Sequence, residues 1–426
     1  MTRFALYFAA SFLLLIIAEP FNKLYAQQSG ELEYRPLRVT LVPGLSTNGI
    51  DATGFTARYS LNIIGGYHGG IDGYEMGLVN ANQRYTRGFQ IGGVNYSGGP
   101  MSGINIGGAV NYSRRSMRGA QISGIGNFSE QSLQGFQLTG MINSGYNSLN
   151  GVQIAGIGNI ARRDLQGLQI AGIFNSTVED SQGIVIAGFG NFNAGRAQGF
   201  MFSGAVNVAR DMQAFSVAGI LNATRNLQGF QISGLANVAY RVRGMQVGLF
   251  NFARDFDGIP VGLVSLYGNG RHNIDVWMSD AGFQNVGLKL GTRSVYNMIS
   301  LGYNPFLRGR EVWSLGWTIG SYTPLDKAWD NPRYEGFFRM RDFTIQNVQE
   351  GSLGTRLNSI YSYRYLLGYD IANGFGIYAG PTFNILLSRE ARSNEYTWYS
   401  IISGERGGSD FSLWLGFIIG MQIFPH

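Results

Sequence analysis

The chain has 426 residues, a formal net charge of +6, 63 glycines and no cysteine. The lack of cysteine excludes a disulfide framework and a lipid-anchoring cysteine. Glycine at this frequency argues against a helical protein, because each glycine inside a helix costs about 1 kcal/mol relative to alanine. The β-branched and aromatic residues between the glycines favour an all-β fold.

The N-terminus has the pattern of a secretory signal peptide, predicted over residues 1–26. Arg3 precedes an apolar run, and the small Ala26 allows cleavage before Gln27. No later apolar run approaches the 18 or so residues that a membrane helix needs. We therefore expect an exported protein, located in the outer membrane or at the cell surface of a diderm bacterium. Residues 27–70 would be an entry or capping segment.

Residues 71–268 consist of a short repeat. Twelve asparagines recur at intervals of 14 to 16 residues, and a glycine stands three positions before each. A period held this strictly indicates one small structural unit stacked on copies of itself. The central glycine and asparagine pairs are Gly108 and Asn111, Gly124 and Asn127, Gly140 and Asn143, Gly156 and Asn159, Gly172 and Asn175, Gly188 and Asn191, and Gly204 and Asn207.

One unit, from Gly167 to Asn175, reads GLQIAGIFN and is followed by a polar stretch. Its apolar Ile170 and Ile173 are three residues apart, so on an unbroken strand they would face opposite sides. A bend at Gly172 would turn both inward. The repeat therefore predicts a narrow β-solenoid of about thirteen coils of 15–16 residues, with these apolar side chains in its core. An aspartate at Ile170 should then be a buried, unpaired charge that costs more than about 3 kcal/mol.

The recurring asparagine has two compatible structural roles. Stacked amides can hydrogen-bond along the solenoid as a ladder. Asparagine also tolerates the left-handed backbone conformation of a tight turn. A second, less regular polar column consists of glutamines 121, 137, 153, 169 and 231.

Arginines gather in the polar turns of the repeat. Residues 80–258 contain 13 arginines against seven acidic residues. The simpler interpretation is a solvated face that keeps the solenoid soluble. The alternative is an edge that binds an anionic glycan or lipopolysaccharide through bidentate contacts; nucleic acid is not expected for an exported protein. The candidate anion-binding residues are Arg114, Arg115, Arg118, Arg162, Arg163, Arg210, Arg225, Arg241 and Arg243.

Residues 269–426 change character, since all six tryptophans lie there and apolar residues alternate with small or polar ones. We predict about eight antiparallel strands that form a C-terminal β-barrel or sheet. Two alternatives stay open: a barrel in the outer membrane, or a soluble sheet that caps the solenoid. In the first, Tyr361, Tyr363, Tyr365, Leu367, Leu415 and Ile419 would face lipid, and Arg364 would point inward to a polar or acidic partner.

No motif for catalysis or cofactor binding is evident. The three histidines are scattered, and the acidic residues of the repeat lie in the turns instead of facing one another on strands. We therefore expect no enzymatic activity, no cofactor and no metal.

The GxQIxGIxN units, the entry VTLVPGLSTNG (residues 39–49) and the exit GIPVGLVSLYGNGRHNIDVW (residues 258–277) resemble the surface-repeat proteins of Bacteroidetes and spirochaetes. The resemblance covers most of the mature chain and implies an envelope location without assigning residue roles. We therefore expect a non-enzymatic cell-envelope protein, acting as a scaffold, adhesion or binding module. Its partners would be the outer membrane, an anionic glycan or another envelope protein. The alternative is an outer-membrane channel or transport protein whose repeats are strands of one large barrel.

Overall fold

The computed structural model describes residues 31–423 except 308, 353, 355, 356, 373, 390–392, 398 and 407. The predicted signal peptide lies outside these residues. The structure is 76% strand and 3% helix, and consists of a parallel β-solenoid of about eleven turns and an eight-stranded antiparallel barrel. The predicted fold class is therefore confirmed, with somewhat fewer turns than the thirteen expected from the repeat.

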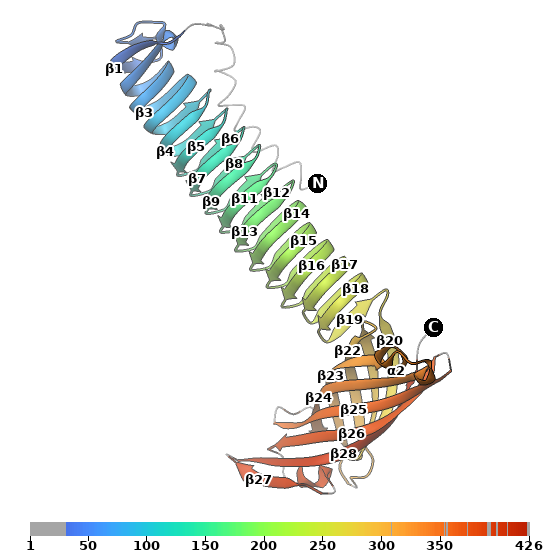
Figure 1. Cartoon of the computed structure of the whole chain (residues 1–426). Coiled ribbons are helices and arrows are strands. Elements are labelled where there is room, and N and C mark those ends of the chain that lie inside the picture. The colour runs from blue at the N-terminus through green and yellow to red at the C-terminus, as the bar shows by residue number, and fades with distance from the viewer. Residues whose placement is uncertain are drawn as a thin grey trace. The chain divides into compact units, whose positions relative to one another are not determined.

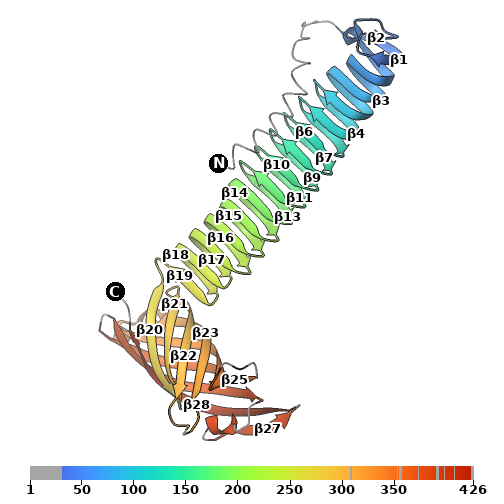
Figure 2. The same cartoon turned by 180° about the vertical axis from the view of Figure 1, so that it is seen from behind.

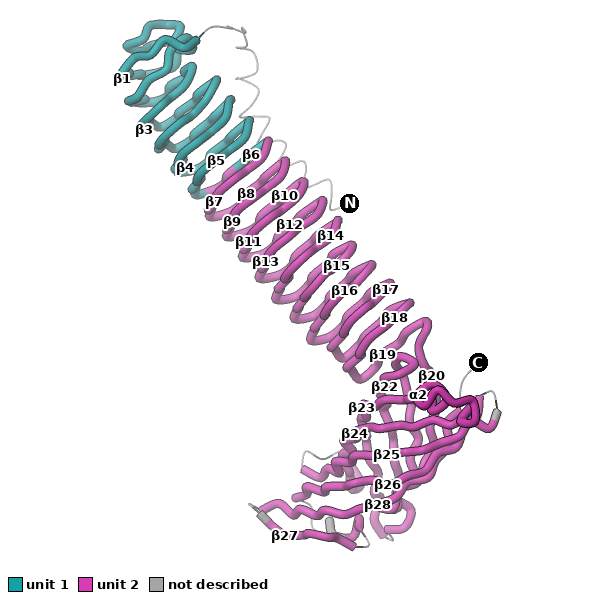
Figure 3. Tube along the Cα trace, viewed as in Figure 1, with its two compact units in different colours: residues 1–124, 128–130 teal, residues 125–127, 131–426 magenta. Residues whose placement is uncertain are grey.

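The chain divides into two compact units (Figure 3). Unit 1 runs up to Gly124 and includes residues 128–130; unit 2 contains residues 125–127 and everything from Gln131 onward. The short strand β6 (Gly126–Ser129) has residues in both.

Unit 1 holds the first coils of the solenoid. Strand β1 pairs in parallel with β3, with Arg38 opposite Ser60, so the described part of the predicted entry segment already forms a coil. Strand β3 pairs with β4, and β4 with β5, all in parallel. The elements are β1 (Glu33–Val42), β2 (Leu45–Ser46), η1 (Ala52–Gly54), β3 (Phe55–Ser97), β4 (Met101–Ser113) and β5 (Met117–Ser123).

The solenoid of unit 2 stacks equivalent strands in register (Figure 1). Asn159 lies opposite Asn143 and Asn175, and Ile170 lies opposite Ile154. The strands are β7 (Leu133–Thr139), β8 (Ile142–Gly145), β9 (Leu149–Ala155), β10 (Gly158–Ala161), β11 (Leu165–Ala171), β12 (Phe174–Thr177), β13 (Ser181–Ala187), β14 (Gly190–Ser203), β15 (Val206–Ala218), β16 (Leu221–Ser233), β17 (Ala236–Val247), β18 (Phe250–Val261) and β19 (Val264–Tyr267).

Each coil from Gly124 onward bends at the predicted glycine, whereas Gly77, Gly92 and Gly108 lie within the continuous strands β3 and β4. The strand stops at Ala171 and resumes at Phe174, with Gly172 and Ile173 forming the corner. A side chain at Gly172 would not fit, since its Cβ would lie 2.0 Å from the carbonyl oxygen of Gly156 in the preceding coil. The bend is therefore confirmed. The alternative of one large barrel built from the repeats is wrong, because neighbouring units pair in parallel and the units from Gly124 onward are broken at their glycine.

The predicted position of the apolar side chains is wrong. Ile173 is 48% exposed and Ile170 is only half-buried, whereas Gln169, Ala171 and Asn175 are buried. Alternation along the strand explains this result, because Gln169 and Ala171 point inward and Ile170 must then point outward. The corner leaves Ile173 outside as well. The solenoid core thus combines buried columns of glutamine and asparagine with an apolar column that includes Leu149 and Leu165, and most isoleucines lie on its surface.

The asparagine column forms a hydrogen-bonded ladder inside the solenoid. The Nδ2 of Asn175 donates to the Oδ1 of Asn191 (2.9 Å) and to the carbonyl oxygen of Ile186 (2.7 Å). Its own Oδ1 accepts from Asn159 (2.8 Å). The only described non-glycine residues with positive φ are Ala214 and Asp330. Of the two roles that the sequence left open, the structure therefore shows the ladder and not the left-handed turn.

The C-terminal region of unit 2 is a closed antiparallel barrel. Eight strands follow the order β20–β26 and then β28, and β28 pairs back to β20. Figure 2 shows β20, β21, β22 and β23 side by side. The strands are β20 (Arg271–Ser279), β21 (Gln284–Gly291), β22 (Val295–Asn304), β23 (Val312–Pro324), β24 (Phe337–Glu350), β25 (Asn358–Ala372), β26 (Phe375–Ser388) and β28 (Ser409–Ile423), with β27 (Ile402–Arg406) paired to β28. The short helices are α2 (Leu325–Trp329), η2 (Pro332–Tyr334) and η3 (Ser393–Tyr396).

The ladder predicts the effect of removing one rung. Replacing Asn175 by Ala deletes three buried hydrogen bonds and leaves the Oδ1 of Asn191 and the carbonyl of Ile186 without this donor, so the free energy of unfolding should fall by about 3 kcal/mol or more. The matched control, Ile170→Ser, changes a half-exposed position and should cost about 1 kcal/mol or less. Denaturant unfolding followed by circular dichroism compares the two. A larger loss for Ile170→Ser would contradict the polar core.

Candidate functional surfaces of the barrel and the solenoid

The outer wall of the barrel carries a belt of apolar side chains. On β28, Leu415 is 53% exposed and Ile419 56% exposed, while the residues directly before them, Trp414 and Ile418, are buried. Tyr363 and Leu367 on β25 face outward, as predicted. We call these residues the apolar belt: Ile274, Val276, Met278, Val286, Leu288, Leu301, Tyr303, Leu315, Phe343, Tyr363, Leu367, Ile377, Phe383, Leu415, Phe417, Ile419 and Met421.

Two arginines interrupt the outward rows of β24. Arg339 and Arg341 lie toward the turn that joins β23 to β24, and the guanidinium of Arg341 is 5.7 Å from the ring centre of Tyr365. Charged and aromatic side chains near a strand end are typical of the edge of an apolar belt.

The interior of the barrel holds the opposite chemistry. Arg364 points inward and forms a buried ion pair with Asp342, as predicted, and the hydroxyl of Tyr296 donates to the same carboxylate (2.6 Å). A second buried pair joins Lys289 to Asp275 (2.5 Å). Each of these two buried cations therefore has a carboxylate partner inside the barrel.

Packed side chains fill the remaining interior. One buried cluster includes Trp277, Phe338 and Tyr378, and another includes Phe283 and Trp414. The indole of Trp414 donates to Asp280 (2.7 Å). Among the described residues, the interior therefore holds paired ions, packed rings and buried polar side chains such as Thr318 and Asn384, as in small barrels that enclose no channel.

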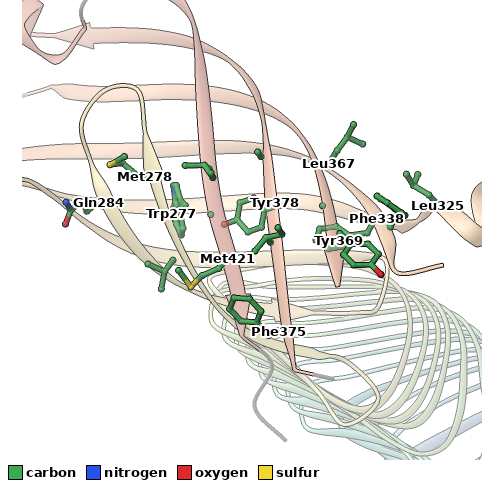
Figure 4. Close-up of a pocket in the computed structure, with 17 residues that line it drawn as sticks. Trp277, Met278, Gln284, Leu325, Phe338, Leu367, Tyr369, Phe375, Tyr378 and Met421 are labelled. Atoms are coloured by element: carbon green, nitrogen blue, oxygen red, sulfur yellow. The ribbon is translucent and has the colours of Figure 1, made fainter. Parts of the chain in front are cut away.

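The barrel also has an apolar pocket of about 790 Å³ (Figure 4). Its lining combines belt residues such as Met278, Leu367 and Met421 with rings of Trp277 and Tyr378. Strands β20, β25, β26 and β28 contribute most of the lining, and Leu325 of α2 adds to it. A lining of this kind suits a hydrocarbon ligand better than a polar one.

The two ends of the barrel differ in the length of their loops. At the end where β20 begins and β28 finishes, the connections are residues 292–294, 325–336 and 373–374. At the opposite end they are residues 280–283, 305–311, 351–357 and 389–408. The solenoid therefore joins the end with mostly short turns, and the longest loop lies at the far end.

The last solenoid turn is hydrogen-bonded to the outside of the barrel. The indole Nε1 of Trp317 donates to the carbonyl of Gly262 (2.9 Å), and the Nδ2 of Asn297 donates to Ser265 Oγ (3.3 Å). Ser265 also accepts from Asn251, the last asparagine of the ladder (3.4 Å). Ser265 thus ends the ladder and links it to the barrel wall.

The surface of the solenoid has an apolar edge, formed by the residue that follows the corner glycine in each coil of unit 2. Ile173 and Phe189 are about half exposed there. The adjacent outward residues of the long strands are apolar too, and Phe200, Phe215 and Phe230 form a stack with ring centres 5.2 and 4.9 Å apart. The apolar edge consists of Ile125, Met141, Ile157, Ile173, Phe189, Ala205, Ile220, Leu235, Leu249 and Leu263, of which Ile157 is half-buried and Ala205 is buried.

The arginines considered for anion binding are all exposed. In unit 2, Arg162 and Arg163 lie in the turn between β10 and β11, whereas the others lie within the continuous strands β15, β16 and β17. Three have acidic neighbours: Arg163 is 4.0 Å from Glu179, Arg210 is 3.7 Å from Asp211, and Arg241 is 3.8 Å from Asp255. These neighbours reduce the net positive charge of the turns. Binding of an anionic glycan there stays a prediction.

Unit 1 contains a buried charged network that sequence reasoning missed. Arg38 and Glu75 are fully buried and 3.4 Å apart, and Glu75 also accepts from Asn62, Asn82 and Gln90. Burial, together with the charge of Arg38, lowers the pKa of His68 to about 2, so this histidine stays neutral. Because the Glu75 side chain is fully buried, it offers no functional group at the surface. It satisfies the amides around it, and the network is structural.

Comparison with known protein families, with curated proteins and with solved structures finds no match. Among the described residues, no helix is long and apolar enough to cross a membrane. The same residues contain no group of three His, Asp or Glu side chains placed to bind a metal ion. The expectations of no cofactor and no enzymatic activity stay predictions.

Proposed function

We propose that this protein is a non-enzymatic component of a diderm cell envelope, anchored in the outer membrane by its C-terminal barrel and presenting its solenoid as a binding module. The observation that carries the proposal is the apolar belt around a barrel whose charges are paired inside. A soluble barrel would bury its apolar residues and expose its ions, whereas a barrel in lipid requires the reverse. The predicted signal peptide agrees with export.

The length of the barrel loops favours a periplasmic solenoid over a surface-displayed one. Outer-membrane barrels have short turns on the periplasmic side and longer loops outside. The solenoid enters at the end whose connections have three, twelve and two residues, and the opposite end has connections of four, seven, seven and 20 residues. We therefore place the solenoid on the periplasmic side in this proposal.

A channel is the weaker alternative. Conduction needs a water-lined path, but the described interior is occupied by Arg364–Asp342, Lys289–Asp275 and packed aromatic rings.

Solenoid enzymes that act on glycans carry paired carboxylates on their strands. The exposed acidic residues of this solenoid, such as Glu179 and Asp255, are instead beside arginines in the turns.

Arginine at position 415 tests whether the belt meets lipid. In a bilayer, Leu415→Arg should cost about 2–4 kcal/mol, because it places a charge in hydrocarbon, whereas Ser409→Arg at the end of the same strand should cost about 1 kcal/mol or less. Denaturant unfolding of the full chain in lipid vesicles measures both. Equal, small losses, together with a full chain that stays monodisperse without detergent, would refute membrane insertion.

Thiol labelling tests the orientation, and the cysteine-free sequence allows single substitutions. On intact cells of a diderm host, a membrane-impermeant maleimide should label Ser400→Cys in the long loop. Arg163→Cys in the solenoid should react only after the outer membrane is permeabilised. Labelling of Arg163→Cys on intact cells would instead place the solenoid at the cell surface.

A further inference from the structure

The role proposed for the solenoid, a binding module, does not explain why one of its edges is apolar. All ten corner residues of unit 2, from Ile125 to Leu263, are apolar. A stacked side chain is covered above and below by its copies, so a value of 48% for Ile173 leaves essentially only its outward side open. Nine spacings of about 4.8 Å and a width of about 10 Å give an edge of roughly 430 Å². This is about the size of the largest apolar patch on a typical monomer, and such patches are often functional.

We propose that this apolar edge binds the acyl chains of envelope lipids on the periplasmic side, next to the lipid-facing surface of the barrel. The proposal rests on the membrane location of the barrel given above. It specifies the ligand class of the binding module: hydrocarbon chains, recognised without hydrogen bonds.

The chemistry of the edge favours hydrocarbon over a protein partner. None of the ten corner side chains offers a hydrogen-bond donor or acceptor, and the same contact repeats about every 4.8 Å. A specific protein partner requires polar groups that fix its register, usually about one hydrogen bond per 100–200 Å². An acyl chain needs only apolar area and fits any register along the edge.

Pairing of two copies along this edge is the less favourable arrangement. A stable dimer buries about 800 Å² on each partner, about twice the area estimated for the edge, so it would have to extend onto the strand face that carries Phe200, Phe215 and Phe230. The edge is also a convex corner, with the chain turning at Gly172 and Ile173. Two convex edges touch along a line, whereas flexible acyl chains can follow either side of the corner.

The edge is also continuous with the barrel belt. Its last corner contains Gly262 and Leu263, and the carbonyl of Gly262 accepts the indole hydrogen of Trp317. Trp317 belongs to the same outward row of β23 as Leu315, a belt residue. One acyl chain can therefore contact both Leu315 and Leu263. The other residues at this junction, Gly262 and Trp317, carry no charge.

Lipid quenching at single cysteines tests the inference. Ile173→Cys, Arg163→Cys and Leu415→Cys are each labelled with an environment-sensitive fluorophore, and the full chain is reconstituted in phosphatidylcholine vesicles that contain nitroxide-labelled acyl chains. Quenching at position 173 should approach that at 415 and exceed that at 163, on the opposite edge, by about fivefold or more. Circular dichroism of each variant confirms that it is folded.

The outcomes separate the two proposals. Quenching at 415 but not at 173 would overturn lipid binding by the edge and leave the membrane barrel intact. No quenching at 415 would overturn the membrane barrel itself. Disulfide-linked dimers of unlabelled Ile173→Cys, without quenching at 173, would show that a second copy covers the edge and would also overturn the inference.

Discussion

The whole solenoid depends on the in-register stacking of identical amides. An asparagine facing inward would normally be costly, because a buried amide without partners loses its hydrogen bonds to water. Here each Asn donates to the Asn of the next coil and to a backbone carbonyl, and accepts from the coil before. The strict period supplies these partners automatically, since every rung has a copy at the same height. A shift of one residue would remove them along the entire column.

A polar core has a direct consequence for the surface. Side chains alternate along each strand, so filling the interior with Gln169, Ala171 and Asn175 sends Ile170 outward, and the corner at Gly172 leaves Ile173 outside. The barrel shows the same inversion for another reason, with Arg364 and Lys289 paired inside and Leu415 outside. Two different folds in one chain thus present apolar surfaces, which is why one solvent, the lipid bilayer, is an economical explanation for both.

The sequence predicted the architecture well, because period and alternation are properties of the backbone. The bend at Gly172, the column of asparagines and the strand faces around Arg364 followed from spacing alone. The core of the solenoid did not follow from spacing. Isoleucine is usually buried, but the inward positions of Gln169 and Ala171 on both sides of Ile170 direct Ile170 outward. The glutamine at 169, in phase with Asn175, contained the information needed.

The network in unit 1 was hidden for a related reason. Arg38, Glu75 and His68 are separated in the sequence and occupy coils of irregular length, so their shared column appears only once β1 and β3 are paired. The lengths of the barrel loops depend on where each strand begins and ends. Composition does not define these boundaries, so the loop lengths could not be predicted from the sequence. The function of the apolar surfaces depends on which molecule contacts them. The spacing of residues in the sequence contains no information about that molecule.

The inverted core is tested most directly by the thiol reactivity of three consecutive positions. Single cysteines at Gln169, Ile170 and Ala171 in the detergent-solubilised full chain would be treated with N-ethylmaleimide, and the reaction rates compared under native and unfolding conditions. The structure predicts that Ile170→Cys reacts at close to its unfolded rate, while Gln169→Cys and Ala171→Cys are strongly protected. Protection at 170 with reactivity at 169 and 171 would contradict the polar core and return the isoleucines to the interior.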